Sequence, residues 1–593
     1  MPKMYKYRFL LRLMVVLLAS GFVFQAVQAV AQSRTEEWQS VAVFSMISTD
    51  DGAPLIKQAF AAMNHPDLLD DFEQAQREAF ATLDFSKPKG IVCQTNGRSF
   101  RLLAFAAMKD VAALPYGIGD LFADIEPNRD GWYKMPFPNA NQMPIVYQSV
   151  YVKQQGDWAY ACYGIASPPK ELPPDPTVLL DGLPEEYPVA LRFNFAALPK
   201  SLVNGYAALG KMSLSMLKTF LPMMEPDRKD RLASFDFITV VASEAIDQLA
   251  KFANETETLT IGLNGNAAND LTITCRLVAK PDTDTAKAIE AIGDCTTDLI
   301  GFYRPDEALY TEIYAYPIAE YEKSFYKNIL TAADELLEVI IDFARANRET
   351  YSDADEMEFF DTLLAPTKTI FSVLQQTVDG GIIDCADFVT ADMTYVAALK
   401  IAGGNALVKP INKLYDFAHL KMAELLIDFG VENEVVWERE NYKDFQFWKV
   451  TVPVPLFSFD DERQLPGSLT YIIGVRDDMF VFAYGMSPTT LDTLKKAIDE
   501  SGKPVPVPRE IVVCSPDRLG QIFKTLGIDL IADENDEGEV VMDIVNSIPE
   551  NAKVVVTQDV EANVLTWTWV SDGKLWPTIG KFLDAYLNLQ LTL

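Results

Sequence analysis

Histidine is almost absent from this chain of 593 residues, which contains only His65 and His419. Ser-His-Asp and Cys-His catalytic groups need a histidine beside the nucleophile, and most structural zinc sites use histidine or clustered cysteine. His65 precedes a proline in an expected helix–helix turn, and His419 lies in an expected helical run. We therefore expect no catalytic residues of these types and no metal site built on histidine.

Glycine-rich phosphate loops are also missing, because neither G-x-G-x-x-G nor G-x-x-x-x-G-K-[ST] occurs. Asp533, Asn535 and Glu537 imitate the start of an EF-hand loop, but the twelfth position is Ile544, where calcium binding requires a bidentate glutamate. We expect neither a cofactor nor a bound metal ion. A carboxylate-dependent hydrolase stays open as an alternative, since 84 acidic residues offer many possible pairs.

Cysteine is scarce and unclustered. The six cysteines show neither a C-x-x-C motif nor zinc-ligand spacing, and they are Cys93, Cys162, Cys275, Cys295, Cys385 and Cys514. An even number permits disulfides in an oxidising compartment, although spacing cannot select the pairs. We favour Cys275 with Cys295, because a strand and the end of the following helix should lie close together. The alternative is that several cysteines are small buried apolar residues.

A membrane span needs about 18 uninterrupted apolar residues, and no run of that length occurs after the N-terminal segment. The N-terminus itself has a basic segment, then the apolar run Leu13–Phe24, then the small residues Ala29–Ala31. This order predicts a secretory signal peptide over residues 1–31, with Gln32 as the first residue of the mature protein. The predicted location is therefore periplasmic or extracellular, with no integral membrane segment after cleavage.

Basic residues are too few to balance the acidic ones, and the formal net charge is −33. Such a chain repels phosphate backbones and anionic headgroups, so the composition excludes nucleic-acid binding and electrostatic binding to acidic membranes. The acids are scattered, which favours a role in solubility. Capture of cations or basic partners is the alternative interpretation.

An internal repeat is the most informative feature that is present. Four segments recur in the same order: Gly90–Lys109 matches Gly381–Lys400 without gaps, Tyr163–Pro168 matches Tyr484–Pro488, Pro199–Gly210 matches Pro516–Gly527, and Asn269–Thr274 matches Asn563–Thr568. The offsets between first residues are 291, 321, 317 and 294. Four weak matches at nearly one offset indicate a tandem duplication.

The local pattern is strand, turn, strand and helix over residues 90–124, 259–293 and 553–590. Short turns such as Asn96-Gly97 join neighbouring strands into antiparallel hairpins. The prediction is an α+β fold of two tandem copies, each an antiparallel sheet with helices. The expected domains are the signal peptide at 1–31, a first copy at 32–303 and a second copy at 304–593.

One helix is predicted in detail. Ile329, Ala333, Leu336, Leu337, Ile340 and Ala344 recur at helical spacing, with acidic residues on the other side. This pattern is typical of a core-facing helix, and a partner-binding helix is the alternative. Together these features favour an exported, soluble, non-enzymatic binding or scaffold protein whose partner is an unknown protein or a small apolar ligand. A carrier of an apolar ligand such as a lipid is one alternative, and the hydrolase is the other.

The signal peptide gives the first testable prediction. Protein recovered from its own host should begin at Gln32, because the small residues at 29 and 31 fit the signal peptidase pocket. Intact-mass measurement with N-terminal sequencing checks this. A mature chain that keeps residues 1–31 would show that the segment stays attached.

Overall fold

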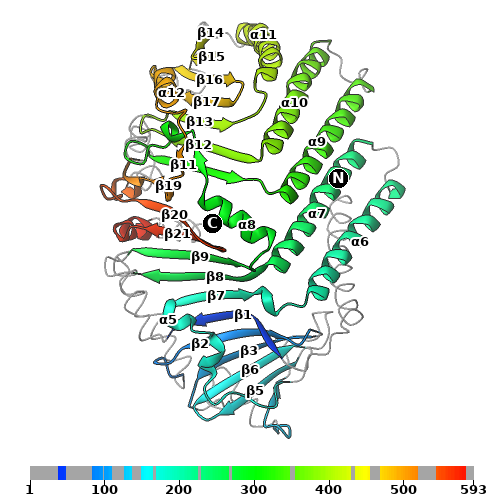
Figure 1. Ribbon diagram of the computed structural model, residues 1–593, viewed down its shortest axis with the longest axis vertical. Coiled ribbons are helices and arrows are strands. Elements are labelled where there is room, and N and C mark those ends of the chain that lie inside the picture. Colours follow the sequence, from blue (N-terminus) through cyan, green and yellow to red (C-terminus); the bar gives the residue numbers. More distant parts are fainter. Residues whose placement is uncertain are drawn as a thin grey trace. The chain divides into compact units, whose positions relative to one another are not determined.

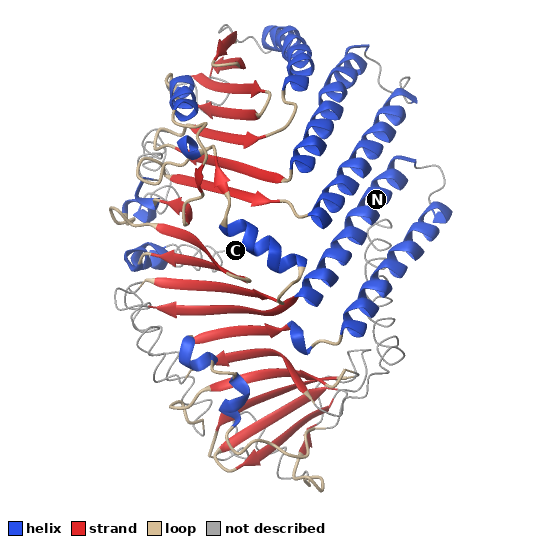
Figure 2. Cartoon of the chain, viewed as in Figure 1, coloured by secondary structure: helices blue, strands red, loops and turns tan. Residues whose placement is uncertain are grey.

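The computed structural model describes residues 38–47, 83–97, 99–109, 126–135, 149–164, 168–224, 229–265, 270–346, 354–428, 435–453, 468–518 and 543–581. The predicted signal peptide, His65 and the Asp533–Gly538 stretch lie outside these residues. The chain groups into two compact units. The first contains residues up to Ser213, Ile246–Ala286 and residues from Asn563, and the second contains Leu214–Ala245 and Lys287–Ala562. Antiparallel strands and helices make up both, as Figure 2 shows, so the predicted α+β class is confirmed.

Ten described strands form the sheet of the first unit, and every neighbouring pair is antiparallel. In spatial order (Figure 1) they are β4 (Tyr133–Met135), β5 (Ser149–Gln155), β6 (Trp158–Gly164), β3 (Phe100–Ala107), β2 (Lys89–Thr95), β1 (Gln39–Met46), β7 (Val189–Asn194), β8 (Thr256–Gly265), β9 (Leu271–Ala279) and β21 (Val564–Ser571). Only some neighbours are consecutive in sequence, because β6 pairs with β3 and β7 pairs with β1.

Nine described strands form the main sheet of the second unit, again with antiparallel neighbours. In spatial order they are β14 (Val436–Tyr442), β15 (Phe445–Pro453), β16 (Ser468–Arg476), β17 (Met479–Gly485), β13 (Tyr395–Lys400), β12 (Ile382–Val389), β11 (Tyr310–Pro317), β19 (Glu510–Cys514) and β20 (Val554–Glu561). Two further short strands, β10 (Thr296–Thr297) and β18 (Val505–Pro506), pair with each other.

Helices connect the strands. In the described part of the chain the α-helices include α5 (Leu183–Glu186), α6 (Lys200–Met224), α7 (Lys229–Glu255), α8 (Asp284–Gly293), α9 (Glu320–Ala346), α10 (Ala354–Gly380), α11 (Asn405–Asp428) and α12 (Thr490–Asp499). The 3-10 turns are η2 (Pro176–Leu180), η3 (Phe195–Ala197), η4 (Ile300–Phe302), η6 (Pro516–Arg518) and η7 (Gly573–Leu575). None of the described helices is long and apolar enough to cross a membrane.

Turn chemistry explains the hairpins. Gly97 has φ +82°, and the amide of Ser99 donates to Oδ1 of Asn96 at 2.9 Å, which closes the predicted turn between β2 and β3. Lys443 and Asp444 both have positive φ between β14 and β15, the backbone of a two-residue turn that matches strand twist. These local signals set which consecutive strands pair.

The register of the two similar hairpins differs, and this corrects one expectation. A gap-free match of Gly90–Lys109 on Gly381–Lys400 requires equal pairing within both hairpins. In the structure Phe105 pairs with Gly90, whereas Val396, its aligned residue, pairs with Phe388 rather than Gly381. Strand β12 begins only at Ile382, and its pairing with β13 has a different register from the pairing of β2 with β3. Gly90–Lys109 and Gly381–Lys400 are therefore not equivalent residue by residue.

The predicted amphipathic helix is α9, which covers the whole expected pattern. Its burial differs from the expectation, because Ala332 and Ile341 are buried whereas Ile340 is exposed. With 3.6 residues per turn, positions 332 and 341 lie on opposite sides of the helix, so α9 is buried on more than the one predicted face. The helix is confirmed, and its single buried face is not.

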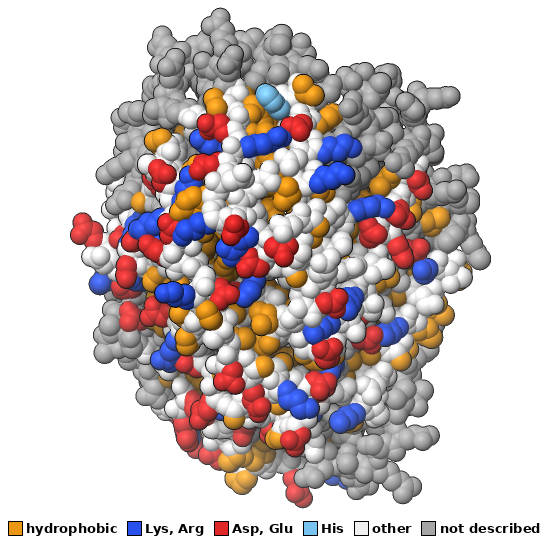
Figure 3. Space-filling view, turned by 45° about the horizontal axis from the view of Figure 1, so that its top comes forward, with side chains coloured by type: hydrophobic (Ala, Val, Ile, Leu, Met, Phe, Trp, Pro, Cys, Tyr) orange, Lys and Arg blue, Asp and Glu red, His pale blue; other side chains and the backbone are white. Residues whose placement is uncertain are grey.

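Each unit has its own core. In the first, η2 and α5 supply Leu180 and Leu183, which pack with Tyr160 and Phe105. In the second, α12 and η4 cover Ile313 and neighbouring strand residues. The surface view of Figure 3 shows acidic and basic side chains interspersed, with no block of one sign on that face. This agrees with the scattered acids of the sequence.

Gly301 offers a test of the second core. A Cβ at this position would lie 2.1 Å from the carbonyl oxygen of Ala497, which cannot move freely because it belongs to α12. Gly301→Ala should therefore destabilise the second unit by about 1–3 kcal/mol, as overpacking does. Denaturant unfolding measures this. The control is Gly380→Ala, whose added methyl meets nothing within 4 Å and should change stability by less than about 1 kcal/mol. Equal stability of both variants would contradict the packing argument.

Candidate functional site

One face of the sheet in the first unit is apolar across nine strands. Paired residues form a row that runs Val152, Ala161, Ala104, Ile91, Phe44, Leu191, Ile261, Cys275 and Trp567. The neighbouring row runs Val150, Tyr163, Leu102, Cys93, Ala42, Phe193, Leu259, Leu277 and Leu565. A shorter third row contains Met46, Val189, Leu263, Ile273 and Trp569. Since residues two apart on a strand share a face, these rows form one surface, called here the apolar sheet face.

Large side chains on the apolar sheet face are left partly open. The exposed fractions are 43% for Ile91, 40% for Leu102, 40% for Ile261, 39% for Ile273 and 39% for Trp569. Apolar area in contact with water costs about 25 cal/mol per Å² relative to its burial. Isolated exposed residues are ordinary, but a continuous surface is typical of a binding site. The continuity of the rows is therefore the decisive observation.

The opposite face of the same strands is already used. Val92, Leu103 and Phe105 point to that side and are buried in the core. Apart from Arg101, strand β3 is thus apolar on both faces, whereas an antiparallel sheet in water normally alternates apolar and polar residues. The unbroken apolar run from Leu102 to Met108 carried this signal in the sequence. Sequence reasoning identified the strand but did not conclude that its second face needs an apolar contact.

Cys93 and Cys275 belong to the apolar sheet face, and the pKa values of their thiols reflect how little solvent reaches them. Burial raises the pKa of the Cys93 thiol and the pKa of the Cys275 thiol, because the thiolate loses solvation there. Neither is a good nucleophile at neutral pH, since reactivity follows the thiolate. The two residues therefore act as small apolar side chains in this face.

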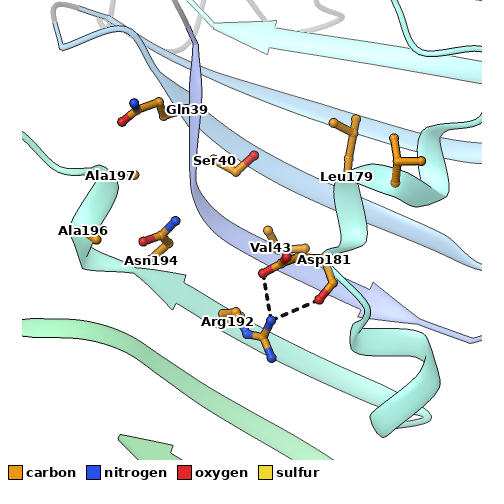
Figure 4. A pocket seen from close by; sticks show the side chains of 10 residues that line it. Gln39, Ser40, Val43, Leu179, Asp181, Arg192, Asn194, Ala196 and Ala197 are labelled. Carbon is orange, nitrogen blue, oxygen red and sulfur yellow. Dashed lines mark hydrogen bonds and ion pairs between the residues drawn. The ribbon is translucent and has the colours of Figure 1, made fainter. Parts of the chain in front are cut away.

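A hollow of about 480 Å³, lined by both polar and apolar side chains, opens on the other side of β1 and β7 (Figure 4). Its lining includes Gln39, Ser40, Val43, Asp181, Arg192 and Asn194. The Arg192 side chain is only 13% exposed and donates to Oδ2 of Asp181 at 2.8 Å and to Oγ1 of Thr260 at 3.0 Å. Its charge is thus neutralised within the protein, so the hollow offers no free cation to an anionic ligand. We interpret Arg192 as a structural link between η2, β7 and β8.

The second unit places two carboxyl groups opposite each other. Glu312 of β11 faces Asp387 of β12 across the strand pair. The Tyr310 hydroxyl donates to Glu312, and the Tyr395 hydroxyl donates to Oδ2 of Asp387 at 2.8 Å. Oδ1 of Asp387 is buried and has no hydrogen-bond partner in the described structure. Burial raises the pKa of Asp387, the bond from Tyr395 lowers it, and the neighbouring Glu312 raises it further.

A second hollow, of about 570 Å³, lies at the start of α11, beside the turns that follow β14 and β16. It is lined by Asp298, Asn405, Asp444, Arg476, Asp477, Asp478 and Gly502. Arg476 donates to Asp478, and Lys400 pairs with Asp298 at 2.5 Å, so part of the negative charge is neutralised. Among the described residues, no group of three or more His, Cys, Asp and Glu side chains is arranged to hold a metal ion.

Three positions of interest in the sequence, His419, Thr283 and the pair Cys275 and Cys295, lie within the described residues. His419 lies against Trp437, with ring centroids 5.1 Å apart. Oγ1 of Thr283 accepts a hydrogen bond from the amide of Ala286 at 3.2 Å, at the start of α8. Cys275 belongs to the first unit and Cys295 to the second, so their disulfide stays a prediction.

Comparison with known proteins adds no identity. No family model, no curated protein and no solved structure matches this chain.

The buried cysteines allow a test of reactivity. Burial raises the pKa of Cys162 to about 11 and, despite a hydrogen bond from Tyr314, the pKa of Cys385 to about 11. At pH 8 the native protein should therefore alkylate at these positions roughly 100-fold more slowly than a model thiol. Peptide mapping after timed iodoacetamide treatment measures this, and the same reaction in denaturant is the control. Fast native modification of either thiol would contradict the burial.

Proposed function

We propose that this chain is an exported, non-catalytic binding protein, and that the apolar sheet face holds the acyl portion of a lipid-like ligand. The observation that carries the proposal is the continuous row of apolar side chains across nine strands, with its large residues partly open. An acyl chain would remove this surface from water. Each buried methylene contributes about 0.8 kcal/mol, so a long chain supplies useful affinity without a polar contact.

The chemistry of the face favours an acyl chain over a protein partner. Its rows contain no charged side chain, and Tyr163 is the one residue in them with a hydroxyl group. The strand backbones are hydrogen-bonded to their neighbours across the interior of the sheet, so they offer few polar groups to a partner. A protein interface typically has about one hydrogen bond per 100–200 Å². A hydrocarbon needs none.

Export and solubility complete the proposal. The predicted signal peptide would place the protein in the periplasm or outside the cell. The full chain has a net charge of −33, and removal of the basic signal peptide would make the mature chain more acidic still. This charge would keep individual molecules apart and away from anionic membranes. Both properties suit a protein that carries an apolar ligand through water.

The proposal includes a tandem duplication, with copies at 32–303 and 304–593. Its support is the strand order, which is β5-β6-β3-β2-β1-β7-β8 in one unit and β16-β17-β13-β12-β11-β19-β20 in the other. Position for position, the strands follow the same connectivity. Such non-local order is harder to produce by chance than a short sequence match.

Native mass spectrometry of protein purified from its own host tests the proposal directly. We expect an added mass of an acyl compound that disappears in a denatured run of the same sample. A bare chain that also fails to bind a fluorescent C18 fatty acid would refute the carrier. A stoichiometric protein partner without lipid would instead support the scaffold alternative.

Variants locate the site. Ile91→Glu and Ile261→Glu each place a charge in the middle of the apolar sheet face, where both side chains have room at the surface. Each should weaken binding of the fluorescent fatty acid at least about 10-fold, because an acyl contact would desolvate the new carboxylate. The control is Val178→Glu on η2, a 69% exposed residue that lies outside the rows. Equal affinities of all three variants would refute this location of the site.

A further inference from the structure

The core side of the sheet in the first unit contains a buried arginine without a counter-charge. Arg101 of β3 is only 7% exposed, and its Nε donates to Oε1 of Gln94 on β2 at 2.9 Å. Within the described residues this is the one hydrogen bond of the guanidinium, and no aspartate or glutamate forms an ion pair with it. Nη1 and Nη2 therefore have no acceptor, although an arginine presents five N–H donors.

The groups around Arg101 do not neutralise it. The guanidinium carbon lies 4.0 Å from the centroid of the Trp38 ring, and this cation–π contact attracts the charge without removing it. The neighbouring Cys162 thiol stays protonated, because burial raises its pKa to about 11. The residues paired along the row of Arg101 are all uncharged, and they are Ser149, Gly164, Gln94 and Ser40.

Arginine cannot escape this situation by losing its proton. Burial lowers the pKa of Arg101, but an arginine starts above about 12 and stays charged at neutral pH, unlike a lysine or a histidine. A buried positive charge without a partner is strongly unfavourable, because the protein replaces too little of the solvation that water supplied. A bound anion would supply the missing negative charge.

Arg192 shows how the same side of the sheet satisfies an arginine from within the protein. It pairs with Oδ2 of Asp181 at 2.8 Å and with Oε2 of Glu186 at 3.8 Å, and it donates to Oγ1 of Thr260 at 3.0 Å. Arg101 is buried on the same side, but no acid of the described chain pairs with it. The missing carboxylate is therefore particular to the position of Arg101.

The free donors indicate which kind of anion fits. Nη1 and Nη2 lie side by side in the guanidinium plane, and such a pair matches the two oxygens of a carboxylate. Trp38 covers one face of that plane, so the ligand contacts its edge. The amide nitrogen of Gln94 is a further donor, since its Oε1 is turned to Arg101. One carboxylate balances one guanidinium, whereas a phosphate dianion would bury an excess negative charge.

We propose that Arg101 binds the carboxylate of a small organic acid through Nη1 and Nη2, with the amide of Gln94 as a third donor. The contact is non-covalent, and no proton or electron is transferred. The hollow of Figure 4 opens on the same side of the sheet, and it is lined by Ser40, the residue paired with Gln94. Open volume thus begins two strand spacings, roughly 10 Å, from Arg101. The inference is independent of the proposed function, because the apolar sheet face is the other side of these strands.

Equilibrium dialysis of the native full chain against radiolabelled acetate tests the site directly. We expect one saturable site, from which unlabelled acetate displaces the label at lower concentration than inorganic phosphate does. Absence of saturable acetate binding would overturn the proposal, and tighter binding of phosphate would overturn the choice of a carboxylate. The measurement uses the unaltered chain and no acyl ligand, so it does not depend on the folding of a variant or on the fate of the carrier proposal.

Thermal unfolding of Arg101→Met separates a ligand site from a purely structural role. Methionine removes the unpaired charge and keeps an unbranched side chain beside Trp38, so in acetate-free buffer the variant should unfold at the native temperature or above it. Acetate at saturation should raise the Tm of the native protein by about 2 °C or more, and Arg101→Met should lose this rise.

The matched control is Arg192→Met, which should keep the acetate response because Arg192 is paired within the protein. An equal response of all three proteins would be a general salt effect and would overturn the site. A clear loss of stability of Arg101→Met in acetate-free buffer would show that the arginine stabilises the fold without a ligand, and it would overturn the proposal as well.

Discussion

Antiparallel pairing fixes what each face of these sheets can do. Inside a sheet, neighbouring strands satisfy the backbone donors and acceptors, so only side chains decide what a face contacts. In the first unit one face meets the core residues Leu180 and Leu183 of η2 and α5. The other face contains Phe44, Ile91 and Ile261 in paired register. A sheet with two apolar faces needs two contacts, and this requirement leads to the proposed ligand.

Burying a charged group costs free energy unless it is hydrogen-bonded, so the buried charged groups that have partners can be distinguished from those that do not. Asp384 is almost fully buried, but it accepts from the Thr297 hydroxyl at 2.7 Å and from the amide of Asp298 at 3.2 Å. Arg192 is satisfied in the same way by Asp181. Asp387 differs, because one oxygen has no donor and the facing group is another acid. Among Asp384, Arg192 and Asp387, only Asp387 has a buried oxygen without a donor.

Local chemistry made part of the fold predictable. Asn96-Gly97 indicated a turn, and the spacing around Leu336 indicated α9, because both depend on residues close in sequence. The pairing of β6 with β3 and of β7 with β1 joins segments far apart in the chain, and no local pattern encodes it. The rows of the apolar sheet face exist only after that order is known. The carboxyl pair was hidden for the same reason, since 84 acids offer many pairs and only the register selects Glu312 with Asp387.

The acidic composition opposes the self-association that the apolar sheet face would otherwise cause. A partly open apolar surface would bring copies of the chain together if nothing opposed it. A net charge of −33 produces repulsion between copies, and it acts over a distance of about 8 Å at physiological ionic strength. A single uncharged hydrocarbon chain does not experience this repulsion, so it can reach a surface from which other copies are kept away. Under the proposed function, the charge would favour small apolar ligands over self-association, and a loss of acidic residues would weaken that preference.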